Sequence, residues 1–334
     1  MAVAIPLLVI VGPTASGKSA LALDLAERVG GEIVSFDSMQ LYRGFEIGTA
    51  SPTAAELARV PHHFIGEADP ERPWTAGEYA RQARPRIRAI AARGRVPVLV
   101  GGTGFYLRAL LSGLSEAPPR VPAIRQRLRE RVARRGPAAL HRLLRRLDPQ
   151  AAAGIAPRDA ARIIRALEVR LASGRRLSEF WRQPPLPFAE AQPYLLGLDP
   201  PRAALYSRID SRAAGMFQPP GIVEETRQLA ARYGPRLPAL AAHGYKQALD
   251  ILHAASPPAQ ALLEAQREQR QYAKRQLTWF RRQVSARWLR GFGDDPAIQA
   301  EAWELVKRAL ADRPAPAASP PLTPPARKAY SPGG

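Results

Sequence analysis

The stretch that decides the fold is IPLLVIVGPTASGKSALALDLAERVGG, residues 5–31. Its apolar run of strand length, Pro6 to Val11, leads directly into the pattern G-x-x-x-x-G-K-S, and residues with helical spacing follow. A glycine-rich loop between a buried strand and a helix presents backbone N–H groups and a helix N-terminus to a phosphate. The stretch therefore predicts a phosphate-binding loop, although it does not say which molecule carries the phosphates.

Roles within this loop follow from the chemistry of its groups. The backbone amides of Thr14 to Lys18 are expected to hold a diphosphate, and the Lys18 side chain adds a positive charge. The hydroxyl of Ser19 is a suitable ligand for Mg²⁺, which is therefore the expected cofactor. A chance match is the alternative, and the strand-loop-helix context argues against it. The predicted diphosphate-binding residues of the loop are Gly12, Pro13, Thr14, Ala15, Ser16, Gly17, Lys18 and Ser19.

Two more predicted strands end in polar motifs. Residues 31–36 lead into DSMQ at 37–40, and residues 96–100 lead into GGTG at 101–104. A stretch with helical spacing precedes the strand at 96–100. Alternating strands and helices predict an α/β fold in which helices flank a parallel sheet. Ligands bind beyond the carboxyl ends of the strands in such sheets, so the three motifs are expected to form one site.

Asp37 and Thr103 each allow more than one interpretation. The Asp37 carboxylate could ligate Mg²⁺, act as a general base, or only cap the following helix. Ser38 and Gln40 offer donors and acceptors suited to a nucleic-acid base edge. The Thr103 hydroxyl could bind a phosphate oxygen or orient a substrate with Asp37, but spacing alone favours a plain helix N-cap.

The composition of the chain changes after Pro118-Pro119. Residues 119–189 read as an inserted, all-helical subdomain. Residues 121–149 predict two amphipathic helices, and a third helix is expected to be capped by Asp159 and ended by Gly174. The predicted α/β core consists of residues 1–118 and 190–312, including C-terminal helices. Residues 313–334 are rich in proline and have the composition of a disordered tail.

The charge pattern points to a polyanion. The 334-residue chain has a net charge of +20, and the stretch from Val121 to Arg146 contains nine Arg and only one Glu. Such an excess favours a nucleic-acid partner, while a general bias toward arginine is the alternative. Residues 266–282 interleave basic and aromatic side chains, which suits single-stranded RNA or, alternatively, a core helix with its aromatics inward. Arg208 and Arg212 lie one helical turn apart and could clamp a diphosphate or simply be solvated.

The absence of cysteine from the sequence narrows the remaining possibilities. It excludes disulfides, thiolate zinc sites and cysteine nucleophiles, and it fits a reducing compartment. The apolar start is too short to span a bilayer, so we expect a cytoplasmic protein that does not associate with a membrane. His62 and His63 are adjacent and lack a metal-binding spacing, so metal ligation there is not expected.

Together these motifs resemble the tRNA dimethylallyltransferase family. The resemblance extends from Gly12 to about Arg282, and DSMQLYRG followed by GGTGFY is its most specific part. Other matching stretches are GPTASGKSALA, PHHFI, RDAARIIRALEV, RIDSR, HGYKQ and RQYAKRQLTWFRR. The resemblance implies a kinase-like P-loop fold whose loop holds the diphosphate of dimethylallyl diphosphate. It also implies transfer of the dimethylallyl group to N6 of the adenosine 3′-adjacent to the anticodon, in tRNAs reading codons that begin with U, by an enzyme expected to be a monomer.

The resemblance further implies roles for individual residues. Asp37 becomes the general base, Thr103 lies at the reaction centre, and Arg208 and Arg212 bind the diphosphate. The sequence departs from the family pattern at Ser51, Gly66 and Ala161. The residues matching tRNA-contacting positions are Asp37, Ser38, Met39, Gln40, Thr103, Arg125, Ala161, Arg162, Ile163, Ile164, Arg165, Lys274 and Arg275.

Two other functions remain open from the residues. A small-molecule or nucleoside kinase would use the glycine loop and Asp37, but it leaves the arginine-rich insertion and the helix at 266–282 without a role. A nucleic-acid-dependent ATPase explains the positive charge, but it leaves GGTGFY without a role.

Overall fold

The computed structural model describes residues 4–183 and 185–311, so the predicted tail at 313–334 lies outside the described residues. The chain forms two compact units. The first consists of the residues before and after Ser112–Pro187, and the second contains that segment. The predicted insertion, 119–189, differs from this segment by a few residues at each end. The second unit ends before the predicted residue 189 because the Phe188 amide already bonds the Leu111 carbonyl of the first unit.

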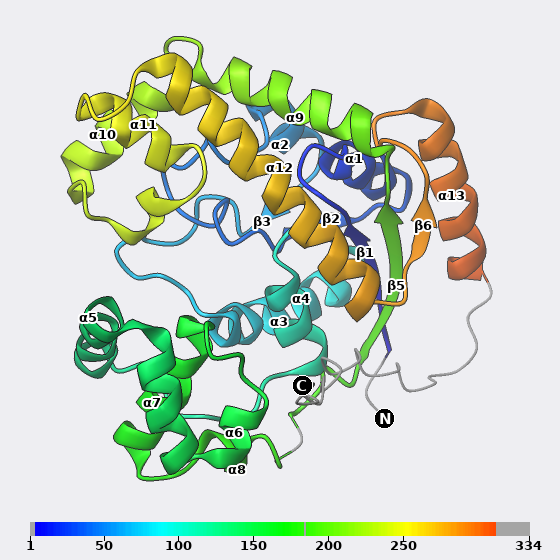
Figure 1. Ribbon diagram of the computed structural model, residues 1–334. Coiled ribbons are helices and arrows are strands. Elements are labelled where there is room, and N and C mark those ends of the chain that lie inside the picture. The colour runs from blue at the N-terminus through cyan, green and yellow to red at the C-terminus, as the bar shows by residue number, and fades with distance from the viewer. Residues whose placement is uncertain (1–3, 184, 312–334) are drawn as a thin grey trace. The chain divides into compact units, whose positions relative to one another are not determined.

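The first unit is built on a parallel sheet. Within the described residues it has six strands in the order β3-β2-β4-β1-β5-β6 (Figure 1). Leu8 of β1 pairs with Val98 on one side and Tyr194 on the other, so β1 lies inside the sheet and its apolar run is buried on both faces. The strands are β1 (Ile5–Val11), β2 (Glu32–Ser35), β3 (His62–His63), β4 (Pro97–Gly101), β5 (Ala191–Leu198) and β6 (Arg287–Leu289).

This order places β2, β4 and β1 side by side. The DSMQ, GGTG and glycine-loop motifs follow these same three strands, so they emerge at one edge of the sheet, as predicted. Beyond β5, β6 extends the sheet in parallel register.

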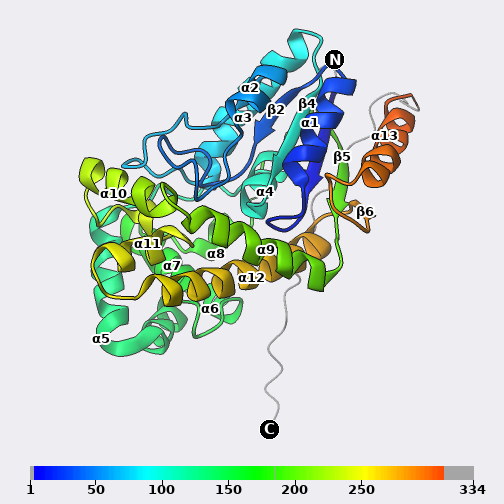
Figure 2. The same ribbon diagram turned by 90° about the horizontal axis from the view of Figure 1, so that it is seen from above.

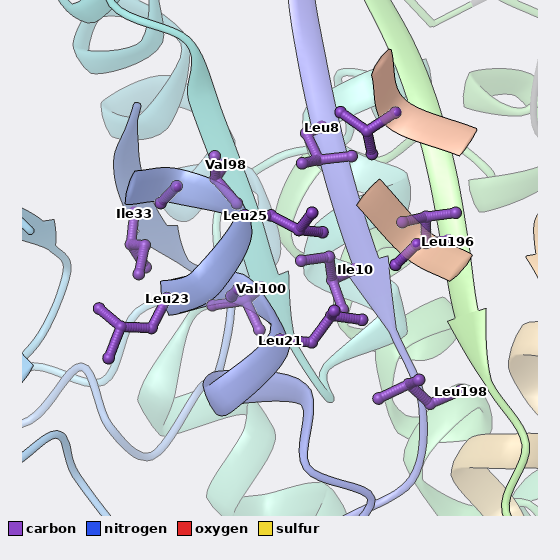
Figure 3. Packing of buried hydrophobic residues seen from close by; sticks show 14 of the residues in the cluster. Leu8, Ile10, Leu21, Leu23, Leu25, Ile33, Val98, Val100, Leu196 and Leu198 are labelled. Atoms are coloured by element: carbon purple, nitrogen blue, oxygen red, sulfur yellow. The ribbon is translucent and has the colours of Figure 1, made fainter. Parts of the chain in front are cut away.

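Helices cover both faces of this sheet (Figures 1 and 2). Leu21 and Leu25 of α1 are fully buried and point toward β1 and β4 (Figure 3). Burying each such leucine contributes about 1.5–3 kcal/mol. The helices of this unit are α1 (Lys18–Arg28), α2 (Ala54–Arg59), α3 (Ala76–Ala92), α4 (Gly104–Ser112), α9 (Arg202–Phe217), α10 (Ile222–Tyr233), the 3₁₀ turn η1 (Pro238–Ala241), α11 (Tyr245–Leu252), α12 (Pro258–Gln283) and α13 (Pro296–Ala311).

Helix α12 packs along α9 (Figure 2). Its buried residues form one continuous stripe. Three or four residues separate successive members of the stripe, which is the spacing of one helix face. Small residues and two glutamines form most of it: Ala261, Ala265, Gln269, Ala273, Gln276 and Phe280. Of the two interpretations of residues 266–282, the core-helix alternative placed the aromatics inward. Phe280 is fully buried, whereas Tyr272 and Trp279 are half-buried, and the buried glutamines were not foreseen.

The second unit is helical. Its helices are α5 (Pro122–Leu147), α6 (Pro149–Ala153), α7 (Ala160–Ser173) and α8 (Leu177–Phe180). Two amphipathic helices were predicted where α5 lies, and the backbone does break at Gly136, whose φ of 71° favours glycine. The Asp159 cap and the Gly174 stop of α7 are both confirmed. Leucine and isoleucine side chains from α5 and α7 form the core of this unit.

No helix within residues 4–183 and 185–311 combines the length and the apolar character needed to cross a membrane.

Candidate active site

The glycine loop after β1 turns tightly into α1. Gly17 has a φ of 81° and precedes Lys18, the first residue of the helix. A β-carbon at Gly17 would lie 2.6 Å from the Asp294 carboxylate and 2.7 Å from the Gly293 amide nitrogen, so no larger residue fits. Because the Gly293 amide also bonds the Ser16 carbonyl over 2.9 Å, the turn before α13 supports the loop from behind.

Three charged groups of this unit interact electrostatically at the loop. The Lys18 ammonium donates a 2.7 Å hydrogen bond to the Pro13 carbonyl. Burial lowers the pKa of Lys18 to about 8, the Asp37 carboxylate opposes this shift, and the Arg212 guanidinium adds to it. Burial also lowers the pKa of Arg212, again opposed by Asp37. Two cations next to one carboxylate leave positive charge for a bound anion.

Thr14 is held from two helices. The Arg212 guanidinium of α9 donates a 2.5 Å hydrogen bond to the Thr14 hydroxyl. The Thr14 amide donates to the side-chain oxygen of Gln276 on α12 over 2.8 Å. This amide was expected to face the diphosphate, but the structure engages it within the protein. The Ser16 amide also bonds the Pro13 carbonyl, over 3.3 Å. The Thr14 hydroxyl and the amides of Ala15, Gly17 and Lys18 remain the anion-binding candidates of the loop.

Asp37 lies in a tight turn after β2. Its Oδ1 accepts hydrogen bonds from the amides of Met39, at 2.8 Å, and Gln40, at 3.4 Å. This carboxylate oxygen therefore caps a turn and not a helix, because the next helix, α2, begins only at Ala54. The other oxygen, Oδ2, lies 3.8 Å from the position that a β-carbon on Gly102 would take. One side chain can thus shape the turn with Oδ1 and present Oδ2 to a ligand.

Thr103 connects the ends of β4 and β2. Its hydroxyl oxygen accepts a 3.0 Å hydrogen bond from the Ser38 amide and lies 3.2 Å from the Ser38 hydroxyl, to which it donates. Tyr272 of α12 also interacts with Thr103, and burial together with the nearby Asp37 carboxylate raises the pKa of Tyr272. Thr103 is therefore more than the plain helix cap that spacing favoured, because it ties GGTG to DSMQ.

Gln276 is the main residue of the site that sequence reasoning missed. Its side-chain oxygen accepts from Thr14, and its nitrogen donates a 3.0 Å hydrogen bond to the Gly102 carbonyl. Trp279, one turn later, covers Gly104 so closely that a β-carbon there would lie 2.2 Å from the indole. The sequence did hold a signal for Gln276, because glutamines alternate with alanines at the spacing of one buried helix face. A glutamine on a buried face needs hydrogen-bond partners.

The two arginines of RIDSR have different partners. Arg212 reaches Thr14, as described above, whereas Arg208 pairs with Asp294 over 2.6 Å and lies 3.9 Å above the Phe292 ring. Arg208 therefore stabilises the turn that supports Gly17, and its contact with a diphosphate stays a prediction. Lys274 and Arg275 are exposed on α12, in keeping with their predicted place on the surface.

In the second unit, the predicted tRNA-contacting residues divide into buried and exposed groups. Arg125 makes a two-pronged ion pair with the fully buried Glu168, at 2.7 and 3.2 Å, and Arg165 adds a third contact to it at 3.1 Å. The side chains of Ile163 and Ile164 belong to the core. Ala161 and Arg162 are exposed. Arg125 therefore has a structural role that the sequence did not reveal.

The Ser19 hydroxyl is exposed at the start of α1, where a bound anion would face it. Among the described residues, no three His, Cys, Asp or Glu gather as metal ligands. Mg²⁺ prefers oxygen ligands, and the Ser19 hydroxyl together with phosphate oxygens and waters would supply them. The residues present thus fit a metal that is held mainly through a bound diphosphate.

A parallel sheet that carries a glycine loop, a carboxylate and a threonine at adjacent strand ends defines a group-transferring enzyme for a phosphate-bearing substrate. A family model described as IPP transferase matches residues 40–283. This chain belongs to the IPP transferase family.

Individual relatives agree with this assignment. A tRNA dimethylallyltransferase from Koribacter versatilis is 51% identical over 301 residues, covering 90% of this chain and 98% of the relative. Another from Solibacter usitatus is 48% identical over 306 residues, covering 91% and 99%. The solved tRNA isopentenylpyrophosphate transferase of Bacillus halodurans is 36% identical, with a TM-score of 0.67 over 92% of this chain and 97% of that one. A eukaryotic dimethylallyltransferase structure, at 24% identity and a TM-score of 0.77, supports the fold alone.

Proposed function

We propose that this chain is a tRNA dimethylallyltransferase. It transfers the dimethylallyl group of dimethylallyl diphosphate to N6 of the adenosine 3′-adjacent to the anticodon, in tRNAs that read codons beginning with U. The observation that carries the proposal is the hydrogen bond between Thr103 and the Ser38 amide, which joins the Asp37 turn to GGTG beside the glycine loop. Membership of the IPP transferase family supports the same reaction.

The glycine loop would bind the diphosphate. Amides following Thr14 lead into the N-terminus of α1, where the helix dipole favours an anion. Lys18 and Arg212 supply positive charge next to it. These groups stabilise the charge that builds on the diphosphate as the carbon–oxygen bond breaks, which makes them more effective in the transition state than in the bound substrate.

Asp37 would act on the nucleophile. As the adenine nitrogen bonds to the allylic carbon, that carbon releases the diphosphate oxygen, and the nitrogen gives up one proton. Oδ2 of Asp37 accepts this proton while Oδ1 keeps its bonds to the turn amides. Thr103 and Ser38 hold the base edge near Oδ2. The target adenosine must leave its stack to reach this point, as bases do in other modifying enzymes.

Mg²⁺ is the proposed cofactor, with Ser19 as its protein ligand. When bound, it would add positive charge to the diphosphate oxygens and help them leave. The protein supplies the remaining positive charge through Lys18 and Arg212. Arg208 pairs with Asp294. It remains a proposed diphosphate contact because it lies one helical turn from Arg212 on α9.

The proposed partner is the anticodon stem-loop of tRNA. Ser38, Met39, Gln40, Lys274 and Arg275 are the proposed contacts in the first unit, and Ala161, Arg162 and Arg165 those in the second. Arg125, Ile163 and Ile164 were also predicted contacts, but they are engaged inside the second unit, with Glu168 or in the core. Eight of the nine arginines between Val121 and Arg146 are exposed, all except Arg125, so the helices that carry them present a strongly basic surface. We further propose that the enzyme acts as a monomer in the cytoplasm.

Two labelled substrates distinguish this function from the alternatives. The full chain is incubated with tRNA and dimethylallyl diphosphate labelled in the prenyl group, and separately with γ-labelled ATP and tRNA or nucleosides. Prenyl label is expected in tRNA at the adenosine beside the anticodon. Transfer or release of the ATP label without prenyl transfer would favour a kinase or a nucleic-acid-dependent ATPase and refute the proposal. The family match already favours prenyl transfer over both alternatives.

A further inference from the structure

One carboxylate far from the glycine loop in sequence organises the segment that follows DSMQ. Glu225 of α10 accepts hydrogen bonds through Oε2 from the amides of Glu46, at 3.1 Å, and Ile47, at 2.6 Å. Its Oε1 accepts from the Gly48 amide, at 3.3 Å, and from the Tyr245 hydroxyl, at 2.5 Å. Four donors therefore converge on one side chain, and such charge-assisted bonds are stronger than neutral ones.

Tyr245 fixes this arrangement from the side of α11. Its ring is 1% exposed and lies so close to Gly48 that a β-carbon there would be 2.5 Å from the ring. Burial and the Glu225 carboxylate raise the pKa of the Tyr245 hydroxyl, so it remains a neutral donor. The segment 46–48 is thus held by backbone bonds on one side and by close packing on the other.

The same segment continues directly to the Asp37 turn. The side-chain nitrogen of Gln40 donates to the carbonyls of Thr49, at 3.3 Å, and Ala50, at 3.2 Å. The side-chain oxygen of Gln40 accepts from the Ser35 hydroxyl over 3.0 Å. Since the Gln40 amide also donates to Asp37, hydrogen bonds and the backbone of residues 46–50 connect Glu225 to Asp37 without a gap.

We propose that Glu225 is a positioning residue for the base-binding turn of the enzyme. It anchors residues 46–48, the adjoining Thr49 and Ala50 hold Gln40, and Gln40 keeps the 37–40 turn in the shape that presents Asp37 to the target adenosine. This inference rests on the proposed function. The glycine loop takes no part in these contacts, so binding of the prenyl diphosphate should not depend on Glu225.

Glu224, the neighbouring residue, provides a matched control. It lies on the same helix but pairs locally with Arg227 and with Gln228. The variants are therefore Glu225→Gln, which loses the charge and half of the acceptor capacity, and Glu224→Gln. Tyr245→Phe is a milder third variant, because it removes one of the four bonds and keeps the ring.

Hydrogen exchange and steady-state kinetics on the full chain test the proposal. In Glu225→Gln, amide exchange at residues 46–48 is expected to accelerate by at least about tenfold. The KM for tRNA should rise about tenfold and kcat fall severalfold, whereas the KM for dimethylallyl diphosphate stays within about twofold. Tyr245→Phe should move the same values in the same direction by less, and Glu224→Gln should leave them unchanged.

The outcomes separate cleanly. Equal rises in both KM values would mean a general loss of structure and overturn the positioning role. Faster exchange at 46–48 with unchanged tRNA kinetics would overturn it as well, as would unchanged exchange in Glu225→Gln. If the unaltered chain failed to prenylate tRNA, the proposed function itself would fall, and the exchange result would still decide whether Glu225 anchors the segment.

Discussion

The side-chain oxygen of Gln276 accepts a 2.8 Å hydrogen bond from the backbone amide of Thr14, 262 positions away in sequence. The other end of the same amide group bonds the Gly102 carbonyl. A single side chain from α12 therefore sets the spacing between the glycine loop and GGTG. Gln276 is 6% exposed, so neither bond competes much with water.

Replacing Gln276 by leucine should leave the Thr14 amide and the Gly102 carbonyl without their partner. Each unsatisfied buried group costs about 1–3 kcal/mol, so we expect a lower unfolding temperature and a lower kcat. Gln276→Glu keeps an acceptor for Thr14 and should lose less activity. Exposed Gln271 on the same helix supplies the control, Gln271→Leu. Thermal unfolding and single-turnover rates check this, and a fully active Gln276→Leu enzyme would contradict it.

Asp37→Asn should reduce the transfer rate by about 10²–10⁴-fold, the usual effect of losing a positioned general base. The asparagine oxygen can still accept from Met39 and Gln40, so the turn and tRNA affinity should persist. Single-turnover rates at saturating substrates give the measurement. Asp69, whose carboxylate also bonds a turn amide, offers the control Asp69→Asn. A variant with a near-normal rate would remove Asp37 from the chemistry.

The pH dependence of prenyl diphosphate binding should reveal Lys18. Its pKa is lowered to about 8, so the ammonium is present below that pH and is lost as the pH rises through it. Affinity should therefore be constant near pH 7 and fall toward tenfold per pH unit above about pH 8. Lys18→Arg, which stays charged, should abolish this dependence. Equilibrium binding between about pH 7 and 9.5 spans the transition; an identical decline in both proteins would assign the titration elsewhere.

Arg125→Ala should destabilise the second unit instead of simply weakening tRNA binding. Removing one partner of a buried ion pair costs about 3–5 kcal/mol, and we expect the lower end because Arg165 and the Val121 amide remain on Glu168. Burial opposes ionisation of Glu168, but its hydrogen bonds from Arg125, Val121 and Arg165 prevail and keep its pKa below 4.5. This contribution is therefore present above about pH 4.5 and is lost as the pH falls through the lowered pKa. Thermal unfolding from about pH 7 to 3 should show a difference between wild type and Arg125→Ala that shrinks toward low pH.

Exposed arginines should account for the salt dependence of tRNA binding. Arg127 and Arg131 are exposed on α5, one helical turn apart. Removing one phosphate-binding arginine should flatten the plot of log affinity against log salt by about 0.9 on a duplex and about 0.7 on a single strand. The double variant Arg127→Ala/Arg131→Ala should thus lower the slope by one to two units, with little change in kcat. Filter binding across a salt series decides it. Coincident slopes and equal affinities would mean that these arginines serve only as solvated surface.

The fold and the three strand-end motifs were predictable because they depend on local patterns. Apolar runs, the glycine loop and the caps of α7 are all encoded within a few residues of where they act. Parallel pairing then brings DSMQ, GGTG and the glycine loop to one edge of the sheet. This placement made Asp37 and Thr103 candidates, whereas their roles at a reaction centre came from the family resemblance.

Partnerships across long stretches of sequence were not predictable. Nothing near Glu225, Gln276 or Glu168 shows that their partners are the amides of 46–48, the Thr14 loop or Arg125. Arg125, in the arginine-rich run, and Arg165 were both predicted to contact tRNA, yet a buried carboxylate holds both. Charge counting describes a surface well, but it cannot tell which members of the run a buried acid has already neutralised.

The position of Ser112–Pro187 between β4 and β5 has a consequence for the order of folding. β1 pairs with both strands, yet β5 is synthesised only after the whole helical unit has been made. Since domains generally fold as units during synthesis, the helical unit can form its core while β1 still lacks one neighbour. We therefore expect that, in chains whose synthesis is halted before β5 is made, hydrogen exchange finds the amides of α5 and α7 protected while those of β1 are not.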